Sequence, residues 1–234
     1  MNNHRLTLTL VLAFLVLFVT GFLSMRWKSV AQNTKLDDHD ALVEALRHGG
    51  VREAARLKGH YVADFDPHWD LISLNLEQLT KNSALIVVGS VAEKLTAHPV
   101  GDAGHLIYTD YEVVVQEVIK GSGFNASTIV VSLPGGRIEF EDGTSAEIRT
   151  PKFEHVKPGT SYTFFLDEGS TGPNIYTLTG GPQGLVEFGG EKAKSHGRDT
   201  DPIAKEENNT DKEIFLNELR KNAKKWPNKG KCCG

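Results

Sequence analysis

Cysteine is almost missing from this sequence of 234 residues, since Cys232 and Cys233 are the only two and stand side by side near its end. The folded part of the chain therefore has no disulfide framework and must be held together by its packed core. Adjacent cysteines pair with each other only through a strained ring. We interpret them as exposed thiols on a tail, with bonds between chains or a bound metal as alternatives.

The short motifs of several enzyme classes are also absent. The chain has no Gly-x-Ser-x-Gly elbow of serine hydrolases, no His-Glu-x-x-His of zinc proteases and no Cys-x-x-Cys pair. Residues 121–123 form a Gly-Ser-Gly turn but lack the Lys-Ser or Lys-Thr partner of a phosphate-binding loop. We therefore predict no catalytic residue and no cofactor, and favour a role other than catalysis.

Basic charge is in short supply, because 26 Lys and Arg residues stand against 30 Asp and Glu residues and give a formal net charge of −4. The first 31 residues hold three of the basic residues and no acidic one. The rest of the chain is therefore more acidic, with 23 basic residues against 30 acidic ones. An acidic surface repels the phosphates of nucleic acids, so we expect no DNA or RNA partner.

One long apolar run is present, over residues 6–25, which carry no charge and consist mostly of Leu, Val and Phe. About 20 apolar residues suffice for a helix to span a bilayer. The run therefore predicts a signal-anchor helix within residues 1–31 that holds the protein to a membrane. A cleaved signal peptide is the alternative, because residues 29–31 offer a small-x-small cleavage site. We expect the remaining chain outside the membrane, so that the protein is located at the cell membrane or is secreted or periplasmic.

Helical and polar segments flank the middle of the chain. Residues 32–70 predict a linker with short helices that two adjacent glycines interrupt. A further short helix is expected over residues 75–81, with Asn75 and the glutamine three residues later as a capping pair. Residues 191–210 are polar without an apolar period and predict a flexible linker. Residues 211–234 predict an amphipathic helix followed by a basic tail.

The segment over residues 71–190 has the pattern of a β-domain. Residues 84–91 form a continuous apolar run, as a fully buried strand does. Apolar and polar residues alternate over residues 106–120 until the phase breaks at Val118 and Ile119, which predicts a bulge. Further strands are expected over residues 128–133, 137–140, 146–149, 161–167, 175–178 and 185–188. About six or seven short strands at this spacing favour a closed or sandwiched β-domain with a single interior.

Three stretches of this segment resemble a known family: LIVVGSV at residues 85–91, YTDYEVVVQEVIKG at residues 108–121 and GGPQG at residues 180–184. The chain resembles a domain of poorly characterised bacterial exported proteins, which is similar to the OB-type barrel of netrin modules and tissue inhibitors of metalloproteinases. The resemblance implies a mainly β fold, a small OB-like barrel flanked by short helices, with the N-terminal transmembrane or signal helix and a C-terminal helix beside it. It implies little about activity, because one fold hosts many functions. Those inhibitors place an N-terminal cysteine on the metal of the enzyme, whereas this chain has no cysteine before Cys232.

One acidic cluster has the residue types of a metal site. Asp64, Asp66, His68 and Asp70 lie close together in the sequence, and carboxylates with an imidazole bind divalent cations. The alternative is an Asp-Pro turn that packs the aromatic residues of this stretch against the barrel. Three other histidines, at positions 98, 105 and 155, are expected in or beside loops, where a shared metal site needs the fold to bring them together.

The favoured function is a non-catalytic binding or interaction domain outside the membrane, with a protein or glycan partner. Its candidate binding loops are residues 95–105 and 134–151, because OB-type barrels bind along one face and through loops. A metal-dependent hydrolase that uses the cluster over residues 64–70 is the first alternative, and a protease-inhibitor-like module is the second. The pattern leaves the oligomeric state open.

Overall fold

The computed structural model describes residues 38–66, 72–169 and 174–227. This part of the chain is mainly β, with a three-stranded and a seven-stranded sheet, which confirms the broad fold class that the sequence predicts. No described helix is both long enough and apolar enough to cross a membrane. The apolar run over residues 6–25 lies outside the described residues, so the signal-anchor stays a prediction.

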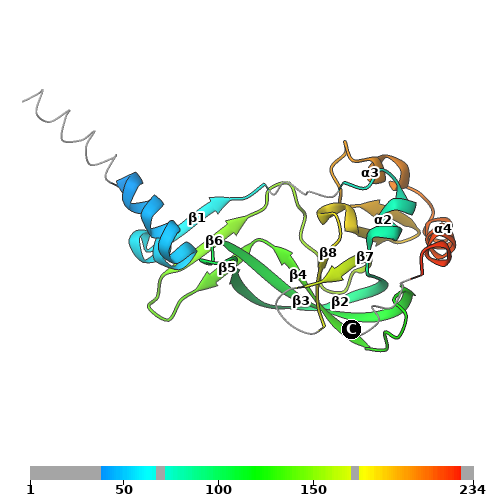
Figure 1. Cartoon of the computed structure of the whole chain (residues 1–234), viewed down its shortest axis with the longest axis horizontal. Helices are drawn as coiled ribbons and strands as arrows, with labels where there is room; N and C mark the ends of the chain where they lie inside the picture. Colours follow the sequence, from blue (N-terminus) through cyan, green and yellow to red (C-terminus); the bar gives the residue numbers. More distant parts are fainter. Residues whose placement is uncertain (1–37, 67–71, 170–173, 228–234) are drawn as a thin grey trace, which may run out of the picture.

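The strands of the larger sheet pair in the order β10-β9-β7-β2-β3-β4-β8 (Figure 1). Their bounds are β2 (Leu85–Val100), β3 (Leu106–Lys120), β4 (Thr128–Pro134), β7 (Ser161–Glu168), β8 (Ile175–Leu178), β9 (Leu185–Gly189) and β10 (Lys192–Ser195). The short strand β8 pairs with β4 in parallel and with β7 in antiparallel fashion. Because β7 also pairs with β2, the strands β7, β2, β3, β4 and β8 close into a ring.

The strand β3 shows how the sequence produces this ring. Its residues alternate between buried and half-buried along the first half, so that Tyr111 and Val113 face the inside. The register with β2 shifts by one residue at Ile119 and again at Gln116. The first shift is the bulge that the break in the apolar pattern predicts. A bulge bends its strand, and bent strands let a sheet close on itself.

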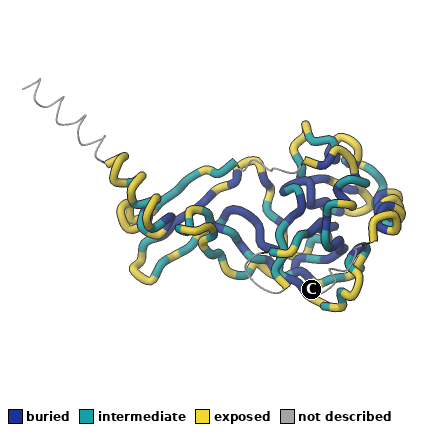
Figure 2. The backbone as a smooth tube through the Cα atoms, in the orientation of Figure 1, coloured by how far each residue is buried: buried dark blue, intermediate teal, exposed yellow. Residues whose placement is uncertain are grey.

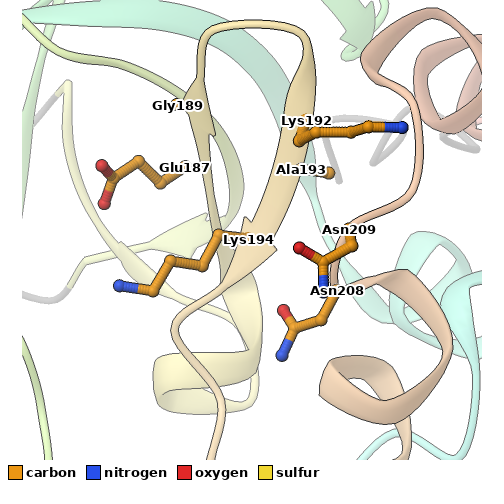
Figure 3. Close-up of a pocket in the computed structure, with 7 residues that line it drawn as sticks. All are labelled: Glu187, Gly189, Lys192, Ala193, Lys194, Asn208 and Asn209. Atoms are coloured by element: carbon orange, nitrogen blue, oxygen red, sulfur yellow. The ribbon is translucent and has the colours of Figure 1, made fainter.

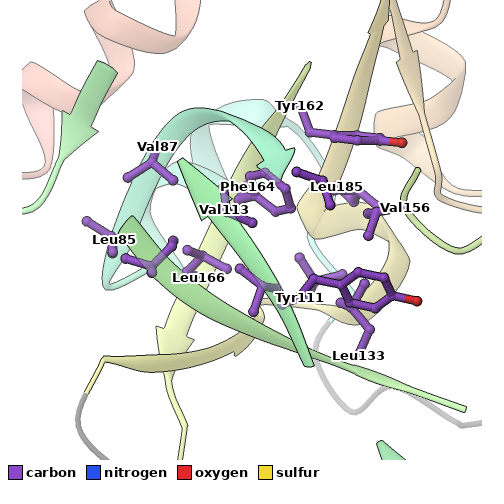
Figure 4. Packing of buried hydrophobic residues seen from close by; sticks show 14 of the residues in the cluster. Leu85, Val87, Tyr111, Val113, Leu133, Val156, Tyr162, Phe164, Leu166 and Leu185 are labelled. Atoms are coloured by element: carbon purple, nitrogen blue, oxygen red, sulfur yellow. The ribbon is translucent and has the colours of Figure 1, made fainter. Parts of the chain in front are cut away.

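A hydrophobic cluster fills the inside of the ring (Figure 4). Its buried members are Leu85, Val87, Val91, Tyr111, Val113, Ile129, Val131, Leu133, Phe153, Val156, Tyr162, Phe164, Leu166, Leu178 and Leu185. The rings of Tyr162 and Phe164 pack with their centroids 5.6 Å apart. Side chains thus occupy the interior of the ring, and burial of this apolar area is the main source of its stability.

A second cluster covers the outer side of the ring, where the helices α2 (Leu76–Asn82), α3 (Pro202–Glu207) and α4 (Lys212–Lys225) pack (Figure 1). Its buried members are Leu76, Leu79, Ile86, Val88, Phe165, Val186, Phe188, Ala193, Ile203, Phe215, Leu216 and Leu219. The start of β2 is therefore buried on both faces, as its continuous apolar run predicts. The helix α2 begins where expected, because the side chain of Asn75 accepts a 2.8 Å hydrogen bond from the backbone N–H of Gln78.

A third cluster holds the small sheet, whose strands β1 (His60–Asp64), β6 (Ser145–Arg149) and β5 (Gly136–Glu139) lie in the order β1-β6-β5. The helix over residues 38–58 packs on this sheet together with the far ends of β2 and β3. The buried members of this third cluster are Val51, Ala55, Ile107, Ala146 and Ile148. Figure 2 shows that buried backbone is concentrated in the ring, whereas this end of the molecule is largely half-buried or exposed. A short 3₁₀ turn, η1 (Gly181–Gly184), precedes β9.

The helix over residues 38–58 contains the two adjacent glycines. Gly50 has a φ of +59° within it, and a Cβ atom at this position would lie 2.0 Å from the carbonyl oxygen of Ala103. The next residue, Val51, donates a 3.0 Å hydrogen bond from its N–H to the carbonyl of Gly104. Glycine is needed here because the helix backbone touches the turn between β2 and β3.

Some expectations differ from the structure. Residues 191–210, in which the sequence predicts a flexible linker, contain β10 and α3 and bury Ala193 and Ile203 completely or nearly so. The prediction of a single interior is wrong, because three separate clusters form. The reason is that β2 buries residues on both faces, and that β2 and β3 extend beyond the ring to cover the small sheet.

Candidate functional site

The acidic cluster that the sequence offers as a metal site is only partly described, since His68 and Asp70 lie outside the described residues. Asp64 is exposed at the end of β1. The carboxylate of Asp66 forms ion pairs with Lys152 and, at 2.6 Å, with Arg198. A metal at Asp66 would have to displace both cations, so the contacts on this side chain are those of a structural ion pair.

Within the described ranges, no group of three or more His, Cys, Asp or Glu side chains is arranged to hold a metal. Two of the histidines that the sequence singles out, His98 and His155, each contact a different neighbour. His98 places Nδ1 3.5 Å from a carboxylate oxygen of Asp110, whereas His155 places Nδ1 3.3 Å from the hydroxyl of Tyr111. Neighbouring residues of a strand point to opposite faces, so the two histidines lie on opposite sides of β3. Burial, followed by the charge of Lys94, lowers the pKa of His155.

The two expected binding loops are mostly strands. Strand β2 continues to Val100, so residues 95–105 form the end of a long hairpin rather than an open loop. Residues 134–151 contain β5 and β6, which pair around Asp142 and Gly143 as the turn signal predicts. Both segments serve to build the small sheet and its contact with β3.

A pocket of about 390 Å³ lies beside the hairpin of β9 and β10, at the turn that joins α3 to α4. Its lining is mostly polar and consists of Glu187, Gly189, Lys192, Ala193, Lys194, Asn208 and Asn209 (Figure 3). In Figure 3 the side chains of Glu187 and Lys194 extend to the same side of the hairpin, while Asn208 and Asn209 lie across β10. Ligand pockets are commonly about 300–1,000 Å³, so this one has room for a small polar ligand.

The pocket is held in shape by hydrogen bonds along the edge of β10. The backbone N–H and carbonyl of Ala193 bond to Thr210 and Asn209, each at 2.9 Å. The side chain of Asn208 accepts a 2.7 Å hydrogen bond from the N–H of Ser195. Asn209 has a φ of +68°, a backbone conformation that asparagine tolerates better than most residues. The turn therefore covers the edge of the sheet and fixes the pocket wall.

A buried histidine contacts the acidic side of the pocket. His196, whose side chain is 1% exposed, places Nε2 2.9 Å from the carboxylate of Glu187. Its Nδ1 lies 3.1 Å from the backbone carbonyl of Glu154. Both ring nitrogens of His196 thus lie against acceptor oxygens.

The lysines give the pocket its positive charge. Hydrogen bonds from Lys157 and then Lys194 lower the pKa of Glu154 to about 2, which keeps this carboxylate ionised. Lys194 lies 3.2 Å from it and Lys157 lies 2.6 Å from it, so two cations share one anion. With Lys192 on the same hairpin, the pocket lining holds two lysines and one acidic residue, Glu187. The site is therefore suited to a polar ligand with negative charge.

The sequence missed this site because most of its side chains come from the stretch predicted as a linker. Glu187 belongs to an expected strand, whereas Lys194 and Asn208 do not. The available signal was the Gly189-Gly190 pair after that strand, which marks a hairpin turn, followed by alternation of exposed and buried residues over 192–195. That alternation is only four residues long and contains no large apolar residue.

Comparison with models of known protein families finds none that matches this chain, and comparison with curated proteins finds no relative.

Proposed function

We propose that this protein is a non-catalytic binding module that takes an acidic, hydroxyl-rich ligand, such as a uronic-acid glycan, in the pocket beside β9 and β10. The observation that carries the proposal is the lining of this pocket, in which amide, ammonium and carboxylate groups stand on a hydrogen-bonded wall. Lysines match the carboxylates of an acidic sugar, and amides both donate to and accept from hydroxyl groups.

We further propose that the ring is an OB-type barrel. Strands β2, β3 and β4 form an antiparallel meander, and β7 returns beside β2. Strand β8 then closes the ring between β4 and β7. This strand order supports a five-stranded Greek-key barrel, an architecture that often serves as a binding module.

The proposal places the binding module outside a membrane, with the apolar run over residues 6–25 as its signal-anchor or signal peptide. The length of that run and the lack of charge within it support this placement. Cell-surface and secreted proteins encounter glycans, which agrees with a sugar ligand. The metal-dependent hydrolase and the protease-inhibitor module stay predictions from the sequence.

Binding of uronic-acid oligosaccharides to the full-length protein in detergent, measured by titration calorimetry, tests this function. We expect the double variant Lys192→Glu and Lys194→Glu to lose about tenfold or more in affinity, because two favourable charges become repulsive. The double variant Lys221→Glu and Lys224→Glu is the matched control, since both lysines are exposed on α4 outside the pocket lining. Equal affinity of the double variant and the control, or the absence of binding to any oligosaccharide of the series, would contradict the proposal.

A further inference from the structure

The strand β1 has an open edge. It lies at one end of the order β1-β6-β5, and within the described part of the chain only β6 pairs with it (Figure 1). The opposite situation holds at β10, whose outer edge is covered by the segment that leads into α4. An uncovered edge presents unpaired backbone groups and is a template for another strand.

The phase of the β1–β6 ladder shows which backbone groups face outward. Gly59 accepts a 3.1 Å hydrogen bond from the N–H of Ser145, and Phe65 donates a 2.7 Å hydrogen bond to the carbonyl of Arg149. Alternate residues of a strand bond to the same side. Every second residue from Gly59 to Phe65 therefore bonds to β6. The backbone groups of the residues between them, His60, Val62 and Asp64, point away from β6. Among the described residues, no backbone hydrogen bond outside the sheet uses these groups.

We propose that β1 pairs in antiparallel fashion with β1 of a second copy of this chain, around a twofold axis at Val62. In this register Val62 stands opposite the partner's Val62, and His60 stands opposite the partner's Asp64. All the outward backbone groups then meet one another, which gives about six hydrogen bonds between the two strands. The two small sheets become one continuous sheet of two subunits, and the same surface is used on both sides as a twofold interface requires.

The side chains of β1 favour this partner over an unrelated strand. His60 and Asp64 are both exposed, and the proposed register sets an imidazole opposite a carboxylate on each side of the axis. Nδ1 of His60 lies 2.7 Å from the hydroxyl of Ser145 on β6, so this contact occupies only one of the two ring nitrogens. Val62 meets its own copy, and β-branched residues pack well across strands. The strand is self-complementary in this register, because the two different groups at its ends, an imidazole and a carboxylate, meet across the axis.

Disulfide trapping in the full-length chain tests both the contact and its register. Cys232→Ser and Cys233→Ser provide a background without cysteine, and the protein is reconstituted in phosphatidylcholine vesicles. In an antiparallel hydrogen-bonded pair the Cα atoms are about 5.5 Å apart, which permits a disulfide, so Val62→Cys is expected to form a covalent dimer. His60→Cys lies on the same edge, but the two copies of this position are roughly 13 Å apart. We expect it to give at most about one-fifth of the dimer that Val62→Cys gives.

Mixing His60→Cys chains with Asp64→Cys chains is expected to restore the disulfide, because these positions face each other. Equal trapping of Val62→Cys and His60→Cys would indicate random collision and overturn the proposal, as would a Val62→Cys protein that stays monomeric because the edge takes another partner or none.

A proline variant separates the interface from the fold. Val62→Pro removes an outward N–H without removing a bond to β6, and proline is tolerated on the open side of an edge strand. We expect this variant to keep the thermal unfolding midpoint of the parent within a few degrees. Because position 62 then carries proline, cross-linking is measured between His60→Cys and Asp64→Cys chains, and we expect the proline to abolish it. Unchanged cross-linking of that pair in the proline variant would overturn the proposal.

Discussion

At the scale of single residues, Glu207 has the most unusual environment among the described acidic groups with a shifted pKa. It is the last residue of α3 and is only 6% exposed. Burial, together with the nearby charges of Glu218 and Glu206, raises the pKa of Glu207 from an ordinary 4.5 to about 7. The folded protein therefore holds a proton on this side chain more tightly than the unfolded chain does. It follows that the stability contributed by Glu207 is present below pH 4.5 and is lost as the pH rises to 7.

This environment predicts a pH-dependent effect of Glu207→Gln, because the amide resembles the protonated acid at every pH. At pH 8 the variant is expected to be more stable than the parent by up to about 3 kcal/mol, whereas at pH 4.5 the two are expected to be similar. Urea unfolding at both pH values measures the difference. The exposed neighbour offers a control, since Glu206→Gln should change the pH dependence far less. A parent protein and a Glu207→Gln variant with the same pH dependence would contradict the prediction.

At the scale of elements, the buried Lys120 at the end of β3 forms hydrogen bonds to the helix α2. Lys120 is 6% exposed, and its ammonium donates hydrogen bonds to the carbonyls of Thr80, Lys81 and Ser83 at 2.8, 3.1 and 2.6 Å. These carbonyls lie at the C-terminal end of α2, where a positive charge also complements the helix dipole. Burial lowers the pKa of Lys120, while the charge of Asp167 raises it in part. The lysine thus caps the helix from a neighbouring strand.

Lys120→Met keeps most of the aliphatic chain but removes the ammonium and leaves these carbonyls without their donor. We expect the free energy of unfolding to fall by about 3 kcal/mol, the cost of unsatisfied buried acceptors and lost charged hydrogen bonds. Chemical unfolding monitored by circular dichroism measures this loss. Lys94→Met makes the same change at an exposed position of β2 and is expected to have an effect within about 0.5 kcal/mol. Similar losses in the two variants would show that the cap has no special role.

The elements that the sequence predicts are those with a strong apolar pattern. The bounds expected for β3 match the structure, because alternation over most of the strand leaves little ambiguity. The sequence pattern does not predict the strand β10 or the helix α3. Their buried apolar side chains are few and include the small residues Ala193 and Ala204. The strand β1 is not predicted for a similar reason, since the residues that face its core are Tyr61 and Ala63.

The candidate site was harder to predict than the elements that carry it. Its wall depends on hydrogen bonds between β10 and a turn some fifteen residues later, such as the one from Ser195 to Asn208. A polar segment gives no periodic signal of such a contact, because asparagine and lysine are also the residues of solvated loops. The same limit applies to Asp66, whose partner Arg198 is distant in sequence. Local pattern identifies which residues are polar, whereas only the fold decides which of them meet.

At the scale of the whole molecule, the ring and the small sheet each have a hydrophobic core, and the long hairpin of β2 and β3 contributes to both. The ring and the small sheet lie toward opposite ends of the long axis in Figure 1. Strands β2 and β3 run from one to the other, so that Tyr111 packs inside the ring while Ile107 of the same face packs on the small sheet. The cluster of the small sheet has five buried apolar residues, against fifteen inside the ring. The small sheet should therefore open more easily than the ring.

Hydrogen exchange measured by mass spectrometry distinguishes one cooperative unit from two. Ile148→Ala removes a side chain from the cluster of the small sheet, where the residue is 4% exposed, and a buried substitution of this kind costs about 2–5 kcal/mol. We expect faster exchange across β1, β5, β6 and the helix over residues 38–58, with β7 and the start of β2 nearly unchanged. Leu166→Ala, inside the ring, should instead accelerate exchange throughout the chain, because the small sheet depends on the ring for the hairpin on which it packs. Uniform acceleration in Ile148→Ala would mean that the two clusters unfold together, and the long hairpin would then transmit stability in both directions.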